Sequence, residues 1–159
     1  MYVNGFLKDL EAAREAEELV LKVFSELSTD FKFEHVGADR ECFYKGDIKA
    51  TAADGREIFI EVKDDSVIHR TRNILCEDEV YYKDTDYYGS GNMQAEYDIY
   101  AVLSREERRI YVIDFSILQD IYTRGEYKEI NHPSQITYCY LLPLGVAKAR
   151  GAVIQVVNY

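Results

Sequence analysis

The stretch GDIKATAADGREIFIEVKDD, residues 46–65, carries the clearest structural signal in the sequence. Asp54-Gly55 is a turn signal of the kind that joins two antiparallel strands, so the sequence on either side is expected to form a β-hairpin. The second strand of this hairpin is mostly apolar, yet it carries Glu61 and Lys63 two residues apart. Side chains alternate along a strand, so these two charged side chains share one face.

The length of the turn sets which residues face each other across the hairpin. A three-residue loop over residues 53–55 places Asp47 opposite Glu61, with Lys63 two residues further along the same face. A two-residue turn instead places Asp47 opposite Val62, which weakens the pairing of the two carboxylates. The sequence alone leaves both registers open.

In the first register, two carboxylates are forced together beside an amine. Directly opposed Cβ atoms lie about 4.5–5.5 Å apart, and at that separation one carboxylate takes up a proton unless a cation neutralises the pair. A divalent cation accepts oxygen ligands from both, and a neighbouring ammonium can orient a water or offset charge on a phosphate oxygen. This combination suits phosphodiester hydrolysis. The alternative is an ordinary cross-strand ion pair on an exposed face.

The first strong element is LKDLEAAREAEELVLKVFSEL, an amphipathic helix expected over residues 7–27. At 100° per residue its apolar side chains fall on one face. The members of this face are Leu10, Ala13, Ala16, Val20, Val23, Phe24 and Leu27.

The rest of the chain is predominantly β-type with short helices between later strands. Strands are expected at 31–36, 42–51, 56–63, 73–82, 97–104, 108–115, 135–142 and 151–157, and short helices at 116–122 and 144–150. No repeat, linker or low-complexity tract interrupts the chain, which predicts one domain over residues 1–159. The fold class expected is α/β, a mixed central β-sheet flanked by helices.

The amino-acid composition limits the classes of function that the chain can have. The net charge of −10 counts against broad attraction to a polyanion, although it leaves room for a local basic groove. Three widely spaced cysteines and the lack of a signal sequence or an apolar span predict a cytoplasmic protein without membrane association. Phosphate-loop, dinucleotide, serine-hydrolase and zinc-protease motifs are absent from the sequence.

Asp47, followed after a turn by Glu61-Val62-Lys63 in an apolar strand, resembles the PD-(D/E)xK nuclease superfamily. The resemblance covers roughly residues 7–120 and is moderately specific. It implies a restriction-endonuclease-like core, in which a helix precedes a strand meander carrying D…ExK, and a further helix and strand follow. The segments YKGDI, IEVKDD and TRNILCEDE…YDIYAV look most like small nuclease-like proteins of bacteria and their phages.

The resemblance also implies roles for individual residues. Asp47 and Glu61 would ligate Mg²⁺ or Mn²⁺ with help from the backbone carbonyl of Val62, and Lys63 would position the attacking water or stabilise the transition state. Gly46 stands where the named motif has proline, a substitution that the superfamily tolerates. No clear helix follows Lys63, which leaves the fourth position of the site open.

Glu17 is a candidate for that position. It falls inside the apolar arc of the first helix, where an unpartnered carboxylate is costly, so a cation is expected nearby. The superfamily often places an acidic residue of this helix beside the metal, and Glu17 matches that role. The alternative is a boundary glutamate that reaches solvent. Glu77 also points toward the site if residues 73–82 form a neighbouring strand.

The sequence therefore predicts a Mg²⁺- or Mn²⁺-dependent (endo)deoxyribonuclease with DNA as its partner. Its phosphate groove is expected to use Lys45, Lys49, Arg70 and Arg72, or to be supplied by a homodimer or a protein partner. One alternative is a catalytically silent nuclease-fold module that docks a protein through an acidic, tyrosine-rich face. Another is a metal-dependent hydrolase of RNA or nucleotides. The segment REERR at 105–109 is expected to be a solvated turn.

Overall fold

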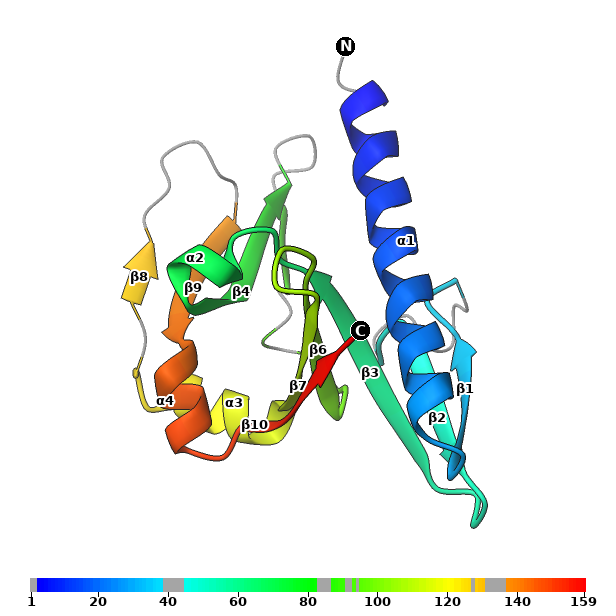
Figure 1. The fold of residues 1–159 in the computed structure, drawn as a ribbon. Helices are drawn as coiled ribbons and strands as arrows, with labels where there is room; N and C mark the ends of the chain where they lie inside the picture. Colours follow the sequence, from blue (N-terminus) through cyan, green and yellow to red (C-terminus); the bar gives the residue numbers. More distant parts are fainter. Residues whose placement is uncertain are drawn as a thin grey trace.

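The computed structural model describes residues 3–38, 45–82, 87–90, 93, 95–126, 128–130 and 137–159 (Figure 1). The helices are α1 (Val3–Leu27), α2 (Ile68–Thr71), α3 (Phe115–Thr123) and α4 (Leu144–Ala149). The strands are β1 (Phe31–His35), β2 (Ile48–Ala52), β3 (Glu57–Asp64), β4 (Asn73–Tyr82), β5 (Tyr87–Ser90), β6 (Ile99–Ser104), β7 (Arg109–Asp114), β8 (Lys128–Ile130), β9 (Thr137–Pro143) and β10 (Val153–Asn158).

The strands form two sheets. The first has six strands in the order β1-β2-β3-β6-β7-β10, and the second has four in the order β5-β4-β9-β8. Within the first sheet β3 and β6 run parallel and every other pair is antiparallel, so this sheet is mixed, as predicted. The chain is therefore α/β, with a mixed central sheet flanked by helices.

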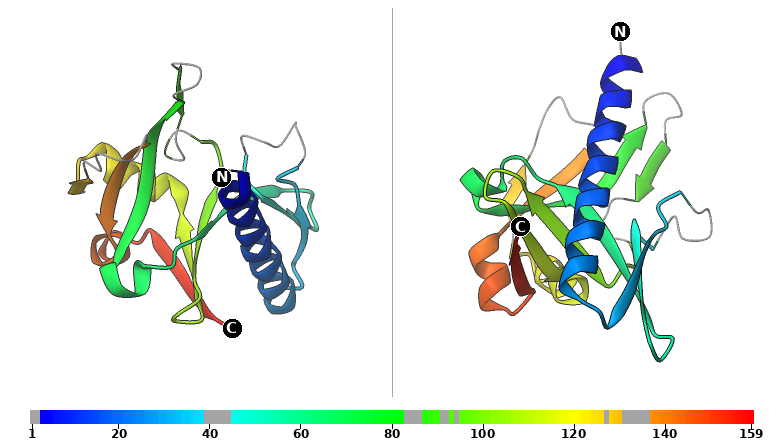
Figure 2. Two further views of the ribbon diagram at one scale, coloured as in Figure 1. Left: turned by 90° about the horizontal axis from the view of Figure 1, so that it is seen from above. Right: turned by 45° about the vertical axis from the view of Figure 1, so that its right-hand side comes forward.

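The first sheet lies between α1 on one side and the second sheet on the other (Figure 2). Each face carries its own apolar core because alternate side chains of β6 and β7 point in opposite directions. The core on the α1 side includes Ala101 and Ile110, whereas the core on the other side includes Val102 and Ile113. Residues of α3 and α4 complete the second core.

The periodicity of α1 correctly identifies its buried face, but only over the middle of the helix. Ala16, Val20 and Val23 are buried against the sheet. Leu10 and Leu27, predicted on the same face, are 50% and 60% exposed. The reason is positional: the N-terminal part of α1 projects beyond the strands, and Leu27 is the last residue of the helix (Figure 1).

The second sheet differs from the single sheet that the sequence predicts. The strand expected at 73–82 forms, but it pairs with β9 and β5 and does not join the central sheet. Three short elements, α2, β5 and β8, were not predicted. Helix α2 has four residues and begins where Asp65 Oδ1 accepts hydrogen bonds from the N–H groups of Val67 and Ile68, each at 2.9 Å. So short an element carries no periodic signal.

The remaining predicted strands and helices are found close to their expected bounds. The strand expected at 42–51 is present as β2 from Ile48 onward, and residues 42–44 lie outside the described part of the chain. Helix α3 begins at a capping residue, because Asp114 Oδ1 accepts a hydrogen bond from the Ile117 N–H at 3.1 Å. In the described ranges, none of the helices combines the length and the apolar character that crossing a membrane requires.

Candidate active site

The β2–β3 hairpin has the three-residue loop. The Ala52 N–H donates to the Arg56 carbonyl at 2.9 Å, and the Gly55 N–H donates to the Ala52 carbonyl at 2.9 Å. Gly55 has φ +84°, a left-handed conformation that glycine adopts without strain and that closes hairpin loops of this length. The paired register runs from Thr51 and Glu57 to Ile48 and Ile60, as the three-residue loop predicts.

Asp47 lies just before β2 and is held against β3 by two hydrogen bonds. Its N–H donates to the Ile60 carbonyl at 2.9 Å, and its Oδ2 accepts from the Val62 N–H at 2.9 Å. Gly46 permits this approach: its φ is +126°, and a Cβ there would lie 2.7 Å from the Ile60 carbonyl oxygen. The two hydrogen bonds place Asp47 beside the residues on either side of Glu61, whose direct pairing with Asp47 stays a prediction.

The carboxyl groups of Asp47 and Glu61 are partly buried, and their pKa values are raised, which favours the neutral form. Burial, followed by the charge of Asp47, raises the pKa of Glu61 to about 8. Burial raises the pKa of Asp47 to about 6, against the hydrogen bond from Val62. At neutral pH the pair therefore favours a bound proton, and a cation would take its place.

Lys63 is held by a carboxylate from the second sheet. Its Nζ lies 3.3 Å from Glu77 Oε1, and Glu77 stands on β4. The predicted approach of Glu77 to the site is therefore present, although β4 reaches it from a separate sheet. The Glu77 charge also contributes to the raised pKa of Glu61. The two sheets meet at this point.

Glu17 points toward the sheet, as its place in the apolar arc predicts. Its side chain is 16% exposed and forms an ion pair with His35 at the end of β1. The Glu17 charge raises the pKa of both Asp47 and Glu61, so it lies within electrostatic reach of them. The sequence predicts a cation near Glu17, and the structure places His35 there.

These side chains line a cleft of about 690 Å³ between α1, the end of β3 and the β6–β7 turn. Glu17, Asp47, Glu61 and Lys63 all contribute to its wall. A second hollow of about 460 Å³ shares Glu17 and Asp47 with the cleft and adds residues of α1 and of the segment after β1. Glu17 and Asp47 therefore line both hollows, whereas Glu61 and Lys63 line the cleft.

The cations of the cleft differ from those predicted. Among the described residues that line it, the cations are Lys63 and Arg105. Lys45 instead lies over the Phe59 ring, 5.2 Å from its centroid. Lys49 pairs with Glu57 at 3.3 Å on the outer part of the hairpin.

Arg105 is the cleft residue that sequence reasoning missed. Its turn was expected to be merely solvated, but β6 runs parallel to β3 with Asp64 beside Leu103, so the turn after β6 lies at the end of β3. Arg105 Nε contacts Asp64 Oδ2 at 2.7 Å. Only the parallel register reveals this proximity, and the sequence carries no local signal for it. Tyr97 is a second missed residue: it is buried, and burial together with the charge of Glu61 raises its pKa.

The described residues offer few possible metal ligands. Within the ranges that the structure describes, no group of three or more His, Cys, Asp or Glu side chains converges closely enough to hold an ion. Asp47 and Glu61 supply two carboxylates. Mg²⁺ is usually bound by one or two carboxylates, with waters and substrate phosphates completing its shell, whereas structural zinc takes four protein ligands. Among the predicted site residues, Asp47 and Glu61 are therefore the ones that could hold an ion of this kind.

Compared with protein-family models, with curated proteins and with solved structures, the chain matches none of them.

Proposed function

We propose that this protein is a divalent-metal-dependent nuclease that hydrolyses DNA phosphodiester bonds in the cleft beside α1. The observation that carries the proposal is the pairing of Asp47 with the Glu61-Val62-Lys63 segment across the hairpin, in an open cleft. Two partly buried carboxyls with raised pKa values beside a lysine are poorly explained by stability, because burying such groups together opposes folding.

We also propose that the core is restriction-endonuclease-like. In support, α1 is followed by the antiparallel meander β1-β2-β3, and the next strand beside β3, β6, is parallel to it. The crossover from β3 to β6 departs from the expected pattern. It contains the four-residue α2 and strands of the second sheet in place of a long helix.

The role proposed for each residue follows from its position in the cleft. Asp47 Oδ and Glu61 Oε atoms, with the Val62 carbonyl, would hold Mg²⁺ or Mn²⁺, which supplies a Lewis acid for the phosphate and a more acidic water. Lys63, oriented by Glu77, would donate hydrogen bonds to the attacking water or to the phosphate oxygens. Glu17 would complete the acidic wall from α1.

Metal titration and cleavage assays test this function together. Mn²⁺ and Mg²⁺ are titrated by calorimetry into the wild type and into the Asp47→Asn/Glu61→Gln double variant. The same samples are incubated with linear, nicked and branched DNA and with RNA. We expect the wild type to bind metal and cleave DNA, and the double variant to lose both, with cleavage reduced by about 10³-fold or more.

A double variant at exposed carboxylates, Glu18→Gln/Asp30→Asn, makes the same change in net charge outside the cleft. It should behave as the wild type does. A wild type that binds no divalent metal contradicts the proposal. Metal binding without cleavage of any substrate favours the docking module instead, and cleavage of RNA alone favours the RNA hydrolase.

A further inference from the structure

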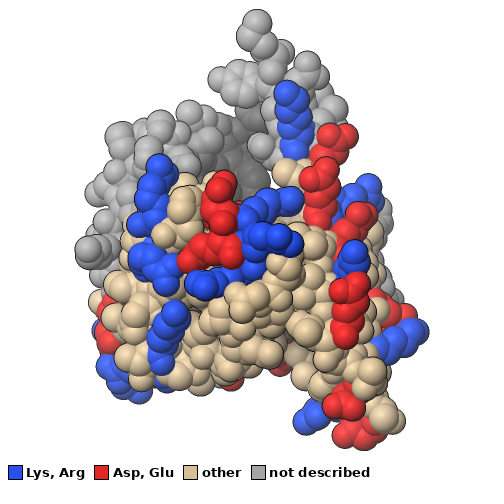
Figure 3. All heavy atoms as spheres, in the orientation of Figure 1, with Lys and Arg blue, Asp and Glu red and all other residues tan. Residues whose placement is uncertain are grey.

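A cluster of cations lies where the β6–β7 turn meets the ends of α2 and α4. We call it the arginine patch, and its members are Arg72, Arg105, Arg108, Arg109 and Lys148. The space-filling view shows Lys and Arg side chains gathered on this face around a small acidic centre (Figure 3). This local excess of cations contrasts with the net charge of −10 for the chain.

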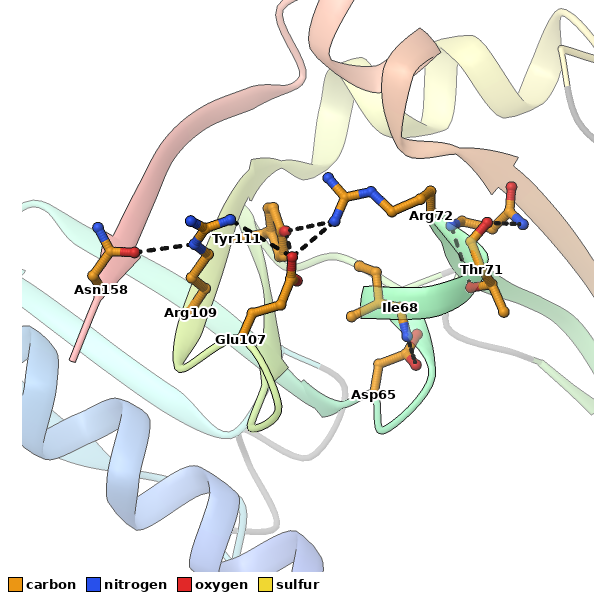
Figure 4. Close-up of polar contacts among 9 residues, drawn as sticks. Asp65, Ile68, Thr71, Arg72, Glu107, Arg109, Tyr111 and Asn158 are labelled. Carbon is orange, nitrogen blue, oxygen red and sulfur yellow. Dashed lines mark hydrogen bonds and ion pairs between the residues drawn. The ribbon is translucent and has the colours of Figure 1, made fainter.

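One carboxylate organises the centre of the patch. Glu107 Oε1 lies 2.8 Å from Arg72 Nη1 and 3.6 Å from Arg109 Nη1, and the Tyr111 hydroxyl donates to Glu107 Oε2 at 2.8 Å (Figure 4). Asn158 Oδ1 accepts a further hydrogen bond from Arg109 Nε at 3.1 Å. Two guanidinium groups therefore share one carboxylate, and each side chain is still about 45% exposed. Both present unused N–H donors to solvent.

Two further cations of the patch contact aromatic rings. Lys148 Nζ lies 5.7 Å from the centroid of the Tyr111 ring, and the Arg108 guanidinium lies 5.9 Å from that of Tyr159. Among the described residues, no carboxylate forms an ion pair with either of these cations. Aromatic contacts leave the positive charges uncompensated.

The backbone of the patch is also unusual. Arg72 has φ +55° and Arg108 has φ +53°, and within the described ranges these are the only residues other than glycine with positive φ. Glycine or asparagine adopts this conformation more easily than arginine. Strained positions are often found at functional sites, and here both carry a guanidinium.

The patch is continuous with the cleft. Arg105 belongs to the same turn as Arg108 and also lines the cleft wall near Lys63. A polyanion that reaches Glu61 and Lys63 therefore passes the β6–β7 turn on one side of the cleft. Spaced guanidinium groups along such a route match the spaced phosphates of a nucleic-acid backbone.

We infer that the arginine patch binds the phosphodiester backbone of a nucleic acid outside the cleft and so holds the strand that the cleft receives. Duplex DNA is the ligand that the proposed function selects, and the inference rests on that function for this choice. Phosphate contacts of this kind supply position and affinity but carry no sequence preference. An acidic chain as a whole repels DNA. The patch can still attract it, because the positive charges are concentrated on one face.

Fluorescence anisotropy with a labelled duplex of about 20 base pairs tests the inference, in EDTA and between about 25 and 200 mM NaCl. The variant Arg109→Gln/Lys148→Gln removes two patch cations. The control Arg56→Gln/Arg124→Gln removes two exposed cations from the β2–β3 turn and from α3. We expect the patch variant to bind about tenfold more weakly at low salt and to lower the slope of log K against log salt by about 2. The control should bind as the wild type does.

A second variant distinguishes a direct loss of DNA contacts from a loss of stability. Arg108→Gly places a residue suited to φ +53° in the turn, so its melting temperature should equal or exceed that of the wild type. Its affinity for the duplex should nevertheless fall about threefold. Equal weakening of binding in the patch and control variants overturns the inference. So does the absence of measurable duplex binding, or binding only to anionic lipid vesicles or to an acidic peptide.

Cleavage assays separate this inference from the proposed function. Metal-dependent cleavage that does not change in the patch variants leaves the function standing and overturns the inference. Patch-dependent binding of DNA without cleavage supports the inference while the nuclease proposal fails. Single-stranded DNA and duplex RNA, measured alongside, identify which nucleic acid the patch prefers.

Discussion

At the scale of single residues, Glu61 shows the greatest conflict between stability and proposed function, because the fold buries a carboxyl group that the function needs in its charged form. Its folded pKa is about 8, against an ordinary value of 4.5. Below pH 4.5 both the folded and the unfolded chain carry the proton, so burial has little effect. Between pH 4.5 and 8 the unfolded chain releases the proton and the folded chain keeps it, so stability falls as pH rises. The full cost, on the order of 5 kcal/mol, applies above pH 8.

Glu61→Gln should therefore stabilise the metal-free protein in a pH-dependent way. The amide has nearly the same shape and does not ionise, so the gain should be on the order of 5 kcal/mol at pH 8.5 and about 1 kcal/mol at pH 5. Urea unfolding in EDTA at the two pH values measures it. Glu18→Gln, an exposed change on α1, should show no such trend. A gain of equal size at both pH values would show that burial of the charge is not the cause.

The sequence identifies those site residues whose proximity is local. Asp47, Glu61 and Lys63 follow from one hairpin register, and Glu17 follows from the 3.6-residue period of one helix. His35, Arg105 and the Lys63–Glu77 contact depend on how separate elements pack, and such contacts leave no periodic trace. The same limit explains why the arginine patch was not predicted, since its members come from the C-terminal end of α2, the β6–β7 turn, the start of β7 and α4.

At the scale of elements, the β2–β3 hairpin holds the site in register, and Gly46 is its most demanding position. A side chain there meets the backbone of Ile60, and φ +126° is outside the range of proline as well as of other residues. This backbone therefore requires glycine at position 46, whereas the sequence suggested only that glycine was harmless there.

Gly46→Ala should destabilise the protein by about 2–4 kcal/mol, because the methyl group forces β2 away from β3. It should also weaken Mn²⁺ binding, since Asp47 moves with β2. Gly55→Ala is the matched control: its φ is +84°, but nothing lies within 4 Å of a Cβ there, so about 1 kcal/mol of backbone strain is expected. Urea unfolding and calorimetry compare them, and equal losses of stability would argue against a clash at Gly46.

The elements themselves were predictable where a pattern is local. The length and apolar periodicity of the sequence over residues 7–27 and the alternation in residues 97–115 predict α1, β6 and β7 at nearly their observed bounds. The pairing of β4 with β9 joins Asn73 to Pro143, far apart in the chain, and a bulge between Glu77 and Glu79 shifts its register. Neither the partner strand nor the bulge has a local signal, so the second sheet was missed.

At the scale of the whole molecule, the first sheet is shared by both cores. Ile110 and Ile113 lie on the same strand, β7, and both are fully buried. Ile110 belongs to the core under α1, and Ile113 belongs to the core that faces the second sheet. Because one strand contributes to both cores, neither core can lose its packing without disturbing the sheet that supports the other. Asp47 and Glu61 lie on the first sheet, whereas Glu77 belongs to the second sheet. We therefore expect cooperative folding of the two sheets to keep the candidate site assembled.

Ile110→Ala and Ile113→Ala should therefore each lower the free energy of unfolding by about 2–4 kcal/mol while leaving a single transition. Far-ultraviolet circular dichroism and the fluorescence of the 14 tyrosines, in a chain without tryptophan, follow unfolding in urea by independent probes. Ile154→Ala, at a side chain 56% exposed on β10, should change stability by less than about 0.5 kcal/mol. If Ile113→Ala shifted only part of the transition, the second sheet would be a separate folding unit. Its contact with Lys63 could then be lost without unfolding the site's hairpin.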